Sequence, residues 1–356
     1  MKHSNILTGS ELNQIFQIAK KNNFAIPAIN VTNSNTIIAC LETAKQNNSP
    51  AIIQFSHGGA SSLSGKSIDN TNHKASINGA IIGAKMIHEL AKVYEVRVAI
   101  HTDHCARKLL PWFEGVLSAS EQYFTEFGRP LFTSQMLDLS TETLSDNIQI
   151  SAEYLKRMSK IDMLLEIELG ITGGEEDGVD NHDIDNAKLY TQPSDVALAY
   201  EKLSSISPNF SIAASFGNVH GVYKPGNVHL QPIILKNSQE YVKNKFNLIE
   251  TEPLNLVFHG GSGSTDSEIK EAIDYGIVKM NLDTDMQWAL WYGVKNYYDI
   301  NKDYLQAQLG NPTGPDAPNK KFYDPRSWLR SGENEFIKIL AHYNELLNNI
   351  DTNKLI

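Results

Sequence analysis

Three histidines, His104, His220 and His259, are spread through the chain, yet each follows or closes an apolar run that predicts a β-strand. A catalytic zinc ion takes about three protein ligands and keeps one position open for water or a substrate oxygen. Imidazole nitrogen is among the ligands that zinc prefers. A lone histidine is more often a buried or surface residue than a ligand, but the shared location at strand ends favours a metal site that does chemistry.

Other polar residues also fall at or just beyond the ends of predicted strands. Asp103 directly precedes His104, so its carboxylate could orient the metal ligand or carry a proton. The remaining members of this group are Asn30, Ser56, Asp138, Glu168, Asn281 and Asp283. In a parallel barrel the C-terminal ends of the strands share one face, and catalytic groups come from several strands at that face. The pattern therefore predicts that these residues meet in one site.

Eight apolar runs of strand length, separated by segments with helical spacing, would position these residues. The runs are 24–30, 51–55, 96–101, 131–138, 163–168, 210–215, 254–259 and 277–282. Continuous apolar runs are typical of parallel strands that are buried on both faces. We therefore predict an α/β fold, a TIM (β/α)8 barrel. Pro27 weakens the first strand, because proline cannot donate to a strand ladder.

The length of 356 residues fits one barrel domain over residues 1–356, since barrels run from roughly 200 to above 400 residues. Residues 303–356 are predicted to form a mainly helical C-terminal extension, interrupted by the proline- and glycine-containing stretch 310–318. A doubly wound open sheet is the competing fold. It would gather its ligands at one switch point rather than from nearly every strand.

Composition excludes several classes of partner. The formal net charge is −10, whereas nucleic-acid binding needs many cations to neutralise phosphates, so we expect no nucleic-acid partner. No run approaches the ~20 apolar residues that span a membrane, and the first ten residues do not read as a secretion signal. We therefore expect a cytoplasmic protein without membrane contact. Two cysteines, Cys40 and Cys105, are too few to form a disulfide framework, and we expect both to stay reduced.

Three segments could hold an anionic substrate. Residues 259–265, His-Gly-Gly-Ser-Gly-Ser-Thr, lead into a predicted helix whose Thr265 and Glu268 have capping-box spacing. Glycines let the backbone approach an anion, and N–H groups at a helix start favour negative charge, so phosphate is a natural guest, although such runs are also ordinary turns. Residues 281–284 could supply more donors or cap the next helix. A basic cluster lies near the C-terminus and could serve a substrate or form a solvated face: Lys320, Lys321, Arg326 and Arg330.

Two connections are longer than turns require. Residues 58–78 are rich in Gly, Ser and Asn, and residues 170–192 are rich in glycine and acids without an apolar period. Loops beyond about 12 to 15 residues in a compact domain are usually functional or disordered. We interpret both as mobile covers over the site, with surface disorder as the alternative. The acids of the second, Glu175 and Glu176, could supply a base or belong to a solvated acidic face.

Several motifs occur along the chain in order. They are Thr102-Asp103-His104-Cys105, Gly173-Gly174-Glu175-Glu176-Asp177-Gly178, Asn218-Val219-His220-Gly221, His259-Gly260-Gly261-Ser262-Gly263, Asn281-Leu282-Asp283-Thr284 and Tyr323-Asp324-Pro325-Arg326. Together they resemble the class II, metal-dependent fructose-bisphosphate aldolases, in particular the longer subgroup. The resemblance covers nearly the whole chain, and a series of motifs in this order is highly specific.

This resemblance implies reversible cleavage of fructose 1,6-bisphosphate to dihydroxyacetone phosphate and glyceraldehyde 3-phosphate, a step of glycolysis and gluconeogenesis. It implies that His104, His220 and His259 are the ligands of a catalytic zinc ion. Asp138 and Glu168 match carboxylates that hold a second or alternative metal position. A monovalent cation, K⁺ or Na⁺, near the phosphate site and a homodimer are also implied.

Two acids receive catalytic roles from the resemblance. Asp103 matches the acid that exchanges a proton with the C4 oxygen, and Glu176 matches the loop base that handles the proton on the enediolate carbon. Arg326 resembles an arginine that meets the second phosphate, supplied in this family by the neighbouring subunit. The other implied substrate contacts are Ser56, Gly221, Gly260, Gly261, Ser262, Asn281, Leu282, Asp283 and Thr284. His57 is a departure, because the family usually has asparagine after the serine.

Four alternatives stay open at this point. Tagatose 1,6-bisphosphate differs from the fructose substrate only in the configuration at one carbon. A lysine-dependent aldolase would use Lys279, in the eighth predicted strand, to form an imine. A metal-dependent phosphohydrolase would release free phosphate. A non-catalytic sugar-phosphate binding protein would keep the pocket without turnover.

Overall fold

Eight parallel strands close into a barrel in the computed structural model, which describes residues 5–170, 173–176, 179–180, 190–220, 230–261 and 263–356. The strands are, in barrel order, β1 (Ile26–Asn30), β11 (Ile277–Leu282), β10 (Leu256–Phe258), β8 (Phe210–Ala214), β5 (Leu164–Leu169), β4 (Ser134–Leu137), β3 (Val98–Thr102) and β2 (Ala51–Phe55). Each lies within or overlaps one of the eight predicted runs. The TIM-barrel prediction is therefore confirmed, and the open-sheet alternative is wrong.

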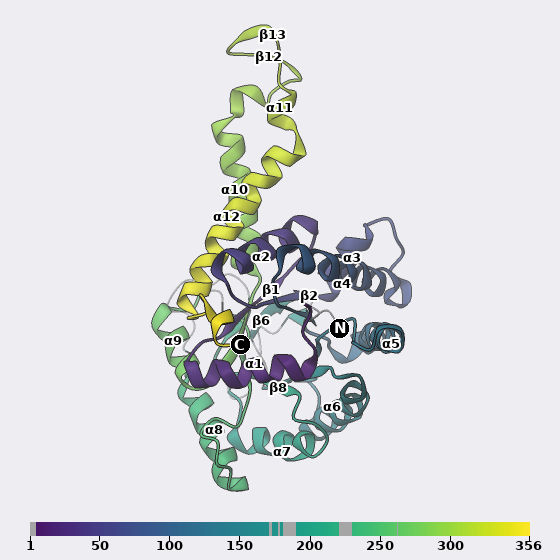
Figure 1. Ribbon diagram of the computed structural model, residues 1–356, viewed down its shortest axis with the longest axis vertical. Helices are drawn as coiled ribbons and strands as arrows, with labels where there is room; N and C mark the ends of the chain where they lie inside the picture. The colour runs from purple at the N-terminus through teal and green to yellow at the C-terminus, as the bar shows by residue number, and fades with distance from the viewer. Residues whose placement is uncertain (1–4, 171–172, 177–178, 181–189, 221–229, 262) are drawn as a thin grey trace.

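Helices connect the strands and cover the outside of the barrel (Figure 1). They are α2 (Ser34–Asn47), α4 (Lys74–Tyr94), α5 (Leu110–Phe127), α6 (Leu144–Met158), α7 (Pro193–Ser204), α8 (Ile233–Phe246) and α9 (Asp266–Asp274), and α10 (Thr284–Ile300) follows the last barrel strand. In α2 the apolar residues Ile37, Leu41 and Ala44 are buried, as their spacing predicts. Its N-cap is Asn33, whose side chain accepts a hydrogen bond from the backbone of Thr36.

The inside of the barrel is apolar at one end and polar at the other. Helix α1 (Gly9–Asn22) closes the N-terminal end of the strands. Its apolar face joins strand residues in one buried cluster that includes Leu12, Ile15, Phe16, Ile26, Ala28, Ile52, Ala99 and Leu164. Further along the same strands the inward side chains become polar, for example Gln54 after Ile52 and His101 after Ala99. The polar end of the barrel therefore carries the candidate site.

A long projection extends from the barrel (Figure 1). Helices α10 and α12 (Pro325–Leu346) run side by side, with α11 (Lys320–Tyr323) and an antiparallel hairpin at the far end, β12 (Leu309–Asn311) and β13 (Gly314–Pro318). A Cβ on Gly293 of α10 would lie 2.4 Å from the carbonyl oxygen of Ser331 in α12, so glycine permits this close approach. The region after residue 303 is largely helical, and the interruption at 310–318 is the hairpin.

The segment 58–78, predicted as a long loop, contains helix α3 (His57–Ser64) and a short 3-10 turn (Thr71–His73). Ser56 caps α3 by accepting a hydrogen bond from the backbone N–H of Gly59 at 3.1 Å. A Cβ on Gly79 of α4 would lie 1.8 Å from the carbonyl oxygen of Ala60, so α3 and α4 can touch only because glycine is present. Tertiary packing overrides the low helix propensity of this glycine- and serine-rich sequence.

Part of segment 170–192, predicted to lack regular structure, forms short strands. These are β6 (Gly173–Glu176) and β7 (Val179–Asp180), and β6 also pairs in parallel with β9 (Val219–His220). The remainder of the predicted cover, residues 171–172, 177–178 and 181–189, lies outside the described residues.

Among the described residues, no helix is both long enough and apolar enough to cross a membrane. Cys40 and Cys105 are buried free thiols, as predicted.

Candidate active site

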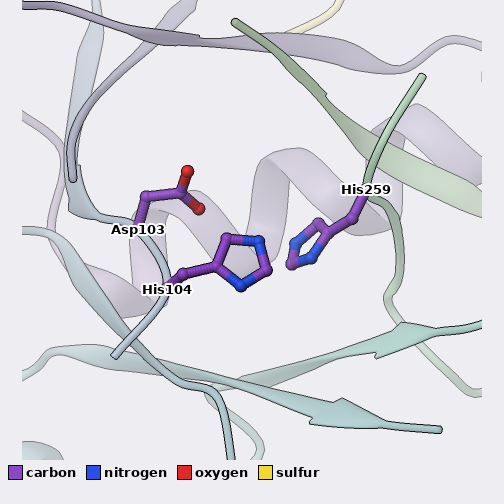
Figure 2. Close-up of side chains that lie close together, drawn as sticks. All are labelled: Asp103, His104 and His259. Carbon is purple, nitrogen blue, oxygen red and sulfur yellow. The ribbon is translucent and has the colours of Figure 1, made fainter. Parts of the chain in front are cut away.

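His104 and His259 face each other at the C-terminal end of the barrel strands, with Asp103 beside them (Figure 2). His259 directly follows β10, and the two imidazole centroids lie 4.6 Å apart. Strand β3 ends at Thr102, so the alternation of side chains between the two faces of a strand stops there, and both Asp103 and His104 reach the site. One ligand atom from each of Asp103, His104 and His259 lies within 4.8 Å of the others, and all three residues are buried. This cluster fits a metal ion.

His259 is oriented by a buried acid. Its Nε2 donates to Glu166 Oε1 at 2.9 Å, which turns Nδ1 toward Glu168 Oε2, 3.4 Å away. A second hydrogen bond from a ligating imidazole commonly fixes which nitrogen meets the metal. Burial alone would lower the pKa of His259, but hydrogen bonds with Glu166 and Glu168 raise it to about 9. A divalent cation can replace such a proton, because metal binding releases protons from its ligands.

A second group of ligand atoms adjoins the first. His104 Nδ1 lies 3.1 Å from Asp138 Oδ2 and 3.4 Å from Glu168 Oε2, and the three residues again have ligand atoms within 4.8 Å of one another. Burial alone would raise the pKa of Asp138, but hydrogen bonds from His104 and Ser140 lower it to about 2. The structure therefore brings together four of the five predicted metal ligands.

The fifth predicted ligand, His220, occupies β9 rather than the end of a barrel strand. Gly174 of β6 pairs with His220 of β9, so the backbone of the acidic segment lies beside that of the histidine. The side chains of His220, Glu175 and Glu176 lie outside the described part of the chain. The structure thus shows that the backbones of β6 and β9 are paired.

The carboxylate of Asp103 is held from both sides. Asn281 Nδ2 donates to its Oδ1 at 3.0 Å, and Asn30 Nδ2 donates to its Oδ2 at 2.9 Å. Gln54 Nε2 donates in turn to Asn30 Oδ1 at 2.5 Å, which fixes the amide so that its nitrogen faces Asp103. Asp103 is fully buried. Hydrogen bonds to both oxygens hold the carboxylate in one orientation, which suits a group that takes up a proton from a bound substrate.

The glycine run after His259 has the backbone freedom predicted for an anion cradle. Gly260 and Gly263 have φ of 63° and 85°, and a Cβ on Gly261 would lie 2.1 Å from the methyl carbon of Met280. Thr265 and Glu268 form the predicted capping box at the start of the following helix, α9, which occupies the backbone N–H groups of these two residues, and the first turn is acidic. Anion binding by this helix start stays a prediction.

The other predicted substrate contacts divide into three groups. Asn281, Leu282, Asp283 and Thr284 join the end of β11 to the start of α10, and Asp283 makes no side-chain cap hydrogen bond there. Ser56 lies at the end of β2, where its hydroxyl caps α3 and keeps its hydrogen for a second partner. Gly221 and Ser262 lie outside the described residues.

Arg326 is not part of the cluster. It is the second residue of α12, a helix of the projection. Its side chain is 90% exposed and pairs with Asp324 at 2.6 Å. Arg330, one turn further along α12, pairs with Glu42 and Glu333. Both arginines therefore lie on the projection. The side chain of Arg326 is 90% exposed, whereas that of Arg330 is 44% exposed.

Two buried residues of the site, Gln54 and Glu166, were not named from the sequence, and Lys279 was considered only as an imine former. Lys279 is 2% exposed, and its Nζ donates to Glu166 Oε1 at 2.9 Å and Asn281 Oδ1 at 2.8 Å. This engaged ammonium does not favour an imine-forming role. Alternation along the strands was the available signal, because Glu166 and Lys279 are two positions before Glu168 and Asn281 on the same inward faces.

His57 makes a local contact next to Ser56. Its Nε2 lies 3.0 Å from His73 Nδ1, and its ring packs edge-on against Trp112 with centroids 5.4 Å apart. Burial, followed by the charges of His73 and Lys108, lowers the pKa of His57 from 6.5 to about 4. Between these two pH values the unfolded chain binds a proton that the folded chain does not, so folding stability decreases as the pH falls through this window.

We expect His57→Asn to reduce this acid sensitivity, because asparagine does not titrate. Thermal unfolding of both proteins from about pH 7 to about pH 4.5 measures the effect. The melting temperature of the wild type should fall further than that of the variant. Melting curves that shift in parallel over this range would contradict the assignment of His57 as a neutral, packed imidazole.

A closed parallel barrel with buried imidazole and carboxylate ligands at the C-terminal ends of its strands defines a barrel protein with a candidate metal centre. The sequence model of the family "Fructose-bisphosphate aldolase class-II" matches residues 10–352. The chain therefore belongs to the class II fructose-bisphosphate aldolase family.

Individual relatives are similar over nearly their full lengths. The chain is 58% identical over 347 residues to "Fructose-bisphosphate aldolase class 2" of Escherichia coli (strain K12), covering 97% of this chain and 96% of the relative. It is 59% identical over 348 residues to a fructose-bisphosphate aldolase of Campylobacter jejuni, covering 98% and 97%. A crystal structure of a fructose-bisphosphate aldolase from Campylobacter jejuni superposes with a TM-score of 0.90 at 56% identity, covering 98% and 97%.

Proposed function

We propose that the chain is a metal-dependent lyase that reversibly cleaves fructose 1,6-bisphosphate to dihydroxyacetone phosphate and glyceraldehyde 3-phosphate in glycolysis and gluconeogenesis. The observation that carries this proposal is the convergence of His104, His259 and Asp103 within 4.8 Å at the catalytic face of a barrel. Family membership supports the reaction. The chain is proposed to act as one domain with its extension over residues 303–356, and in the cytoplasm.

The resident metal is proposed to be zinc, held by His104, His220 and His259. The fit rests on the donor set, because His259 presents Nδ1 to the cluster once Nε2 is bound to Glu166. A bound divalent cation would stabilise negative charge as it develops on the substrate carbonyl oxygen. Asp138 and Glu168 are proposed to offer a second metal position around His104.

The proton transfers are assigned to two carboxylates. In the cleavage direction, Asp103 takes the proton from the C4 hydroxyl as the C3–C4 bond breaks and the aldehyde leaves. The electron pair of that bond remains with the C3 fragment and is delocalised onto its carbonyl oxygen. Glu176 then delivers a proton to C3, which yields the second triose phosphate. Two separate acids let each carbon have its own proton carrier.

The phosphate groups are assigned to the loops at the barrel mouth. Gly260 and Gly261, together with Gly221 and Ser262, would bring backbone N–H groups to one phosphate. Residues 281–284, at the start of α10, and Ser56 would supply further donors. A monovalent cation, K⁺ or Na⁺, is proposed beside this phosphate, where it would offset the charge of the ligand.

A homodimer is proposed because the projection carries apolar surface and Arg326. Exposed apolar side chains gather on α10 and β12: Trp288, Trp291, Tyr292, Tyr298, Ile300 and Leu309. Large exposed apolar surfaces usually mark interaction sites, and a homodimer would cover the same surface on both subunits. In such a dimer the projection can present Arg326 to the second phosphate in the partner's site.

We expect Arg326→Ala to raise KM for the bisphosphate by roughly 10- to 100-fold, since a hydrogen bond between two charged groups is lost. KM for a substrate without the distal phosphate should change little. Arg330→Ala is the matched control, because Arg330 lies one turn further along α12 and its pairs with Glu42 and Glu333 account for its charge. Equal losses on both substrates, or an equal effect of the control, would contradict the assignment.

The reaction is tested by product analysis with zinc-loaded protein. The proposal expects the two triose phosphates as products, inhibition by a chelator, and no inactivation by borohydride in the presence of substrate. Free phosphate would indicate a hydrolase, and borohydride inactivation would indicate an imine at a lysine. Parallel kinetics on tagatose 1,6-bisphosphate measure the preference between the two sugars, and absence of turnover with either would overturn the proposal.

A further inference from the structure

A continuous chain of buried hydrogen bonds joins the imidazole of His259 to the carboxylate of Asp103, and Lys279 lies at its centre. Lys279 Nζ donates to Glu166 Oε1 at 2.9 Å and to Asn281 Oδ1 at 2.8 Å. Glu166 Oε1 also accepts from His259 Nε2 at 2.9 Å. Asn281 Nδ2 donates to Asp103 Oδ1 at 3.0 Å. One ammonium group is thus two hydrogen bonds away from each of these side chains.

The chemistry of an ammonium group makes this arrangement directional. Lysine has three N–H donors and no acceptor, so both neighbours must present oxygen to it. Asn281 therefore turns its Oδ1 toward Lys279, which leaves its Nδ2 to donate to Asp103. Glu166 likewise keeps Oε1 where it can accept the Nε2 proton of His259. The position of Nζ thereby determines an amide orientation on one side and an imidazole tautomer on the other.

Among the described residues, no other lysine or arginine donates to both Glu166 and Asn281. Within the part of the chain that the structure describes, the buried lysine and arginine side chains are Lys20 and Lys279. Lys20 lies at the opposite end of the barrel, where Nζ donates to the backbone oxygens of Glu252 and Leu254. His101 Nε2 lies 3.9 Å from Glu166 Oε1, beyond hydrogen-bond distance. Lys279 is therefore the buried lysine that donates to both acceptors, while Ser211 Oγ donates to the other oxygen of Glu166, Oε2, at 3.3 Å.

We propose that Lys279 is a positioning residue that simultaneously sets His259 for metal binding and Asp103 for proton transfer. The part that concerns Asp103 rests on the proposed aldolase function. The part that concerns His259 needs only a metal ion. This role replaces the imine-forming role considered for Lys279 from the sequence.

The metal affinity of a variant without the lysine distinguishes a positioning role from a simple charge effect. The two roles predict changes in affinity in opposite directions. If Lys279 acted only through its positive charge, replacing it with a neutral residue would strengthen cation binding at a site surrounded by carboxylates. If it positions His259 through Glu166, the replacement disorders a ligand and weakens binding. Loss of a group that orients a ligand typically weakens metal binding by roughly 10- to 100-fold.

The test compares Lys279→Met with Lys20→Met, which removes the other buried ammonium and serves as the matched control. Both proteins are depleted of metal and titrated with zinc against a chromophoric chelator, without substrate. We expect affinity to fall roughly 10- to 100-fold in Lys279→Met and to stay at the wild-type value in Lys20→Met. Unchanged or tighter binding by folded Lys279→Met would overturn the proposal.

The Asp103 side has its own kinetic readout. In zinc-saturated Lys279→Met, kcat for cleavage should fall by a larger factor than KM rises, because the proton carrier is misplaced while the phosphate contacts of the glycine run are intact. A rise in KM with normal kcat would contradict this part. An aldolase assay that fails with the wild type as well would count against the proposed function and leave the zinc titrations interpretable.

A measurement on the wild type covers the case in which Lys279→Met does not fold. Nitrogen-15 NMR of the metal-free protein, labelled at histidine and assigned with His259→Gln, reports which ring nitrogen of His259 carries a proton. Where the ring is neutral, the proposal expects the proton on Nε2, directed at Glu166. A neutral ring protonated on Nδ1 would overturn the proposal without any variant of Lys279.

Discussion

Replacing Asp103 with alanine should lower kcat for cleavage by roughly 10²- to 10⁴-fold, the usual contribution of a positioned general acid or base. The carboxylate is fully buried, and Asn30 and Asn281 each donate to one of its oxygens. A water molecule in the variant would therefore not be held in the position of the carboxylate. Steady-state kinetics with zinc-loaded protein provide the measurement. Metal content must be determined on the same samples, because Asp103 lies within the metal cluster.

Asp266→Asn is the matched control for Asp103→Ala. Asp266 is an exposed aspartate in the first turn of α9, close to the glycine run but outside the hydrogen bonds around Asp103. We expect it to keep wild-type kcat. Near-normal cleavage by metal-loaded Asp103→Ala would remove the proton-carrier role, whereas loss of zinc from this variant would reassign Asp103 as a metal ligand.

Glu176→Gln should suppress the exchange of the C3 proton of dihydroxyacetone phosphate with solvent by about 10²- to 10⁴-fold. Glutamine keeps the size of the side chain but cannot take up and release the proton. Binding should change far less, because the phosphate contacts come from other loops. Exchange is followed by loss of the proton signal in deuterated water, and binding by competition in a separate titration.

The neighbouring acid supplies the control for this experiment. Glu175 directly precedes Glu176 in the sequence and carries the same charge, but the family resemblance assigns the base to Glu176 alone. Glu175→Gln should therefore exchange protons at nearly the wild-type rate. Normal exchange in Glu176→Gln, or equal losses in the two variants, would show that Glu176 is not the base.

The barrel was predictable because its strands are marked by apolar runs that alternate with helical spacing. All eight runs contain or overlap barrel strands, and the polar residues at their ends reach one face. His104 and His259 could be selected as ligands from this pattern before any geometry was known. Their convergence follows from the parallel topology, which places every strand's C-terminal end on the same side.

Other features depend on tertiary contacts that a linear pattern does not contain. Glu166 and Lys279 pair across the barrel although they are 113 positions apart in sequence. Helix α3 forms in a glycine- and serine-rich segment because glycines let it pack against α4. The capping box at the start of α9, in contrast, was predictable from the spacing of Thr265 and Glu268 alone.

We infer that imidazoles from segments far apart in the sequence hold one metal ion on which turnover depends. Stepwise addition of zinc to fully metal-depleted protein, with cleavage of fructose 1,6-bisphosphate measured at each step, tests it most directly. We expect negligible turnover at the start and a linear rise that ends near one zinc per chain. Depleted protein that cleaves the sugar at the undiminished rate would contradict it.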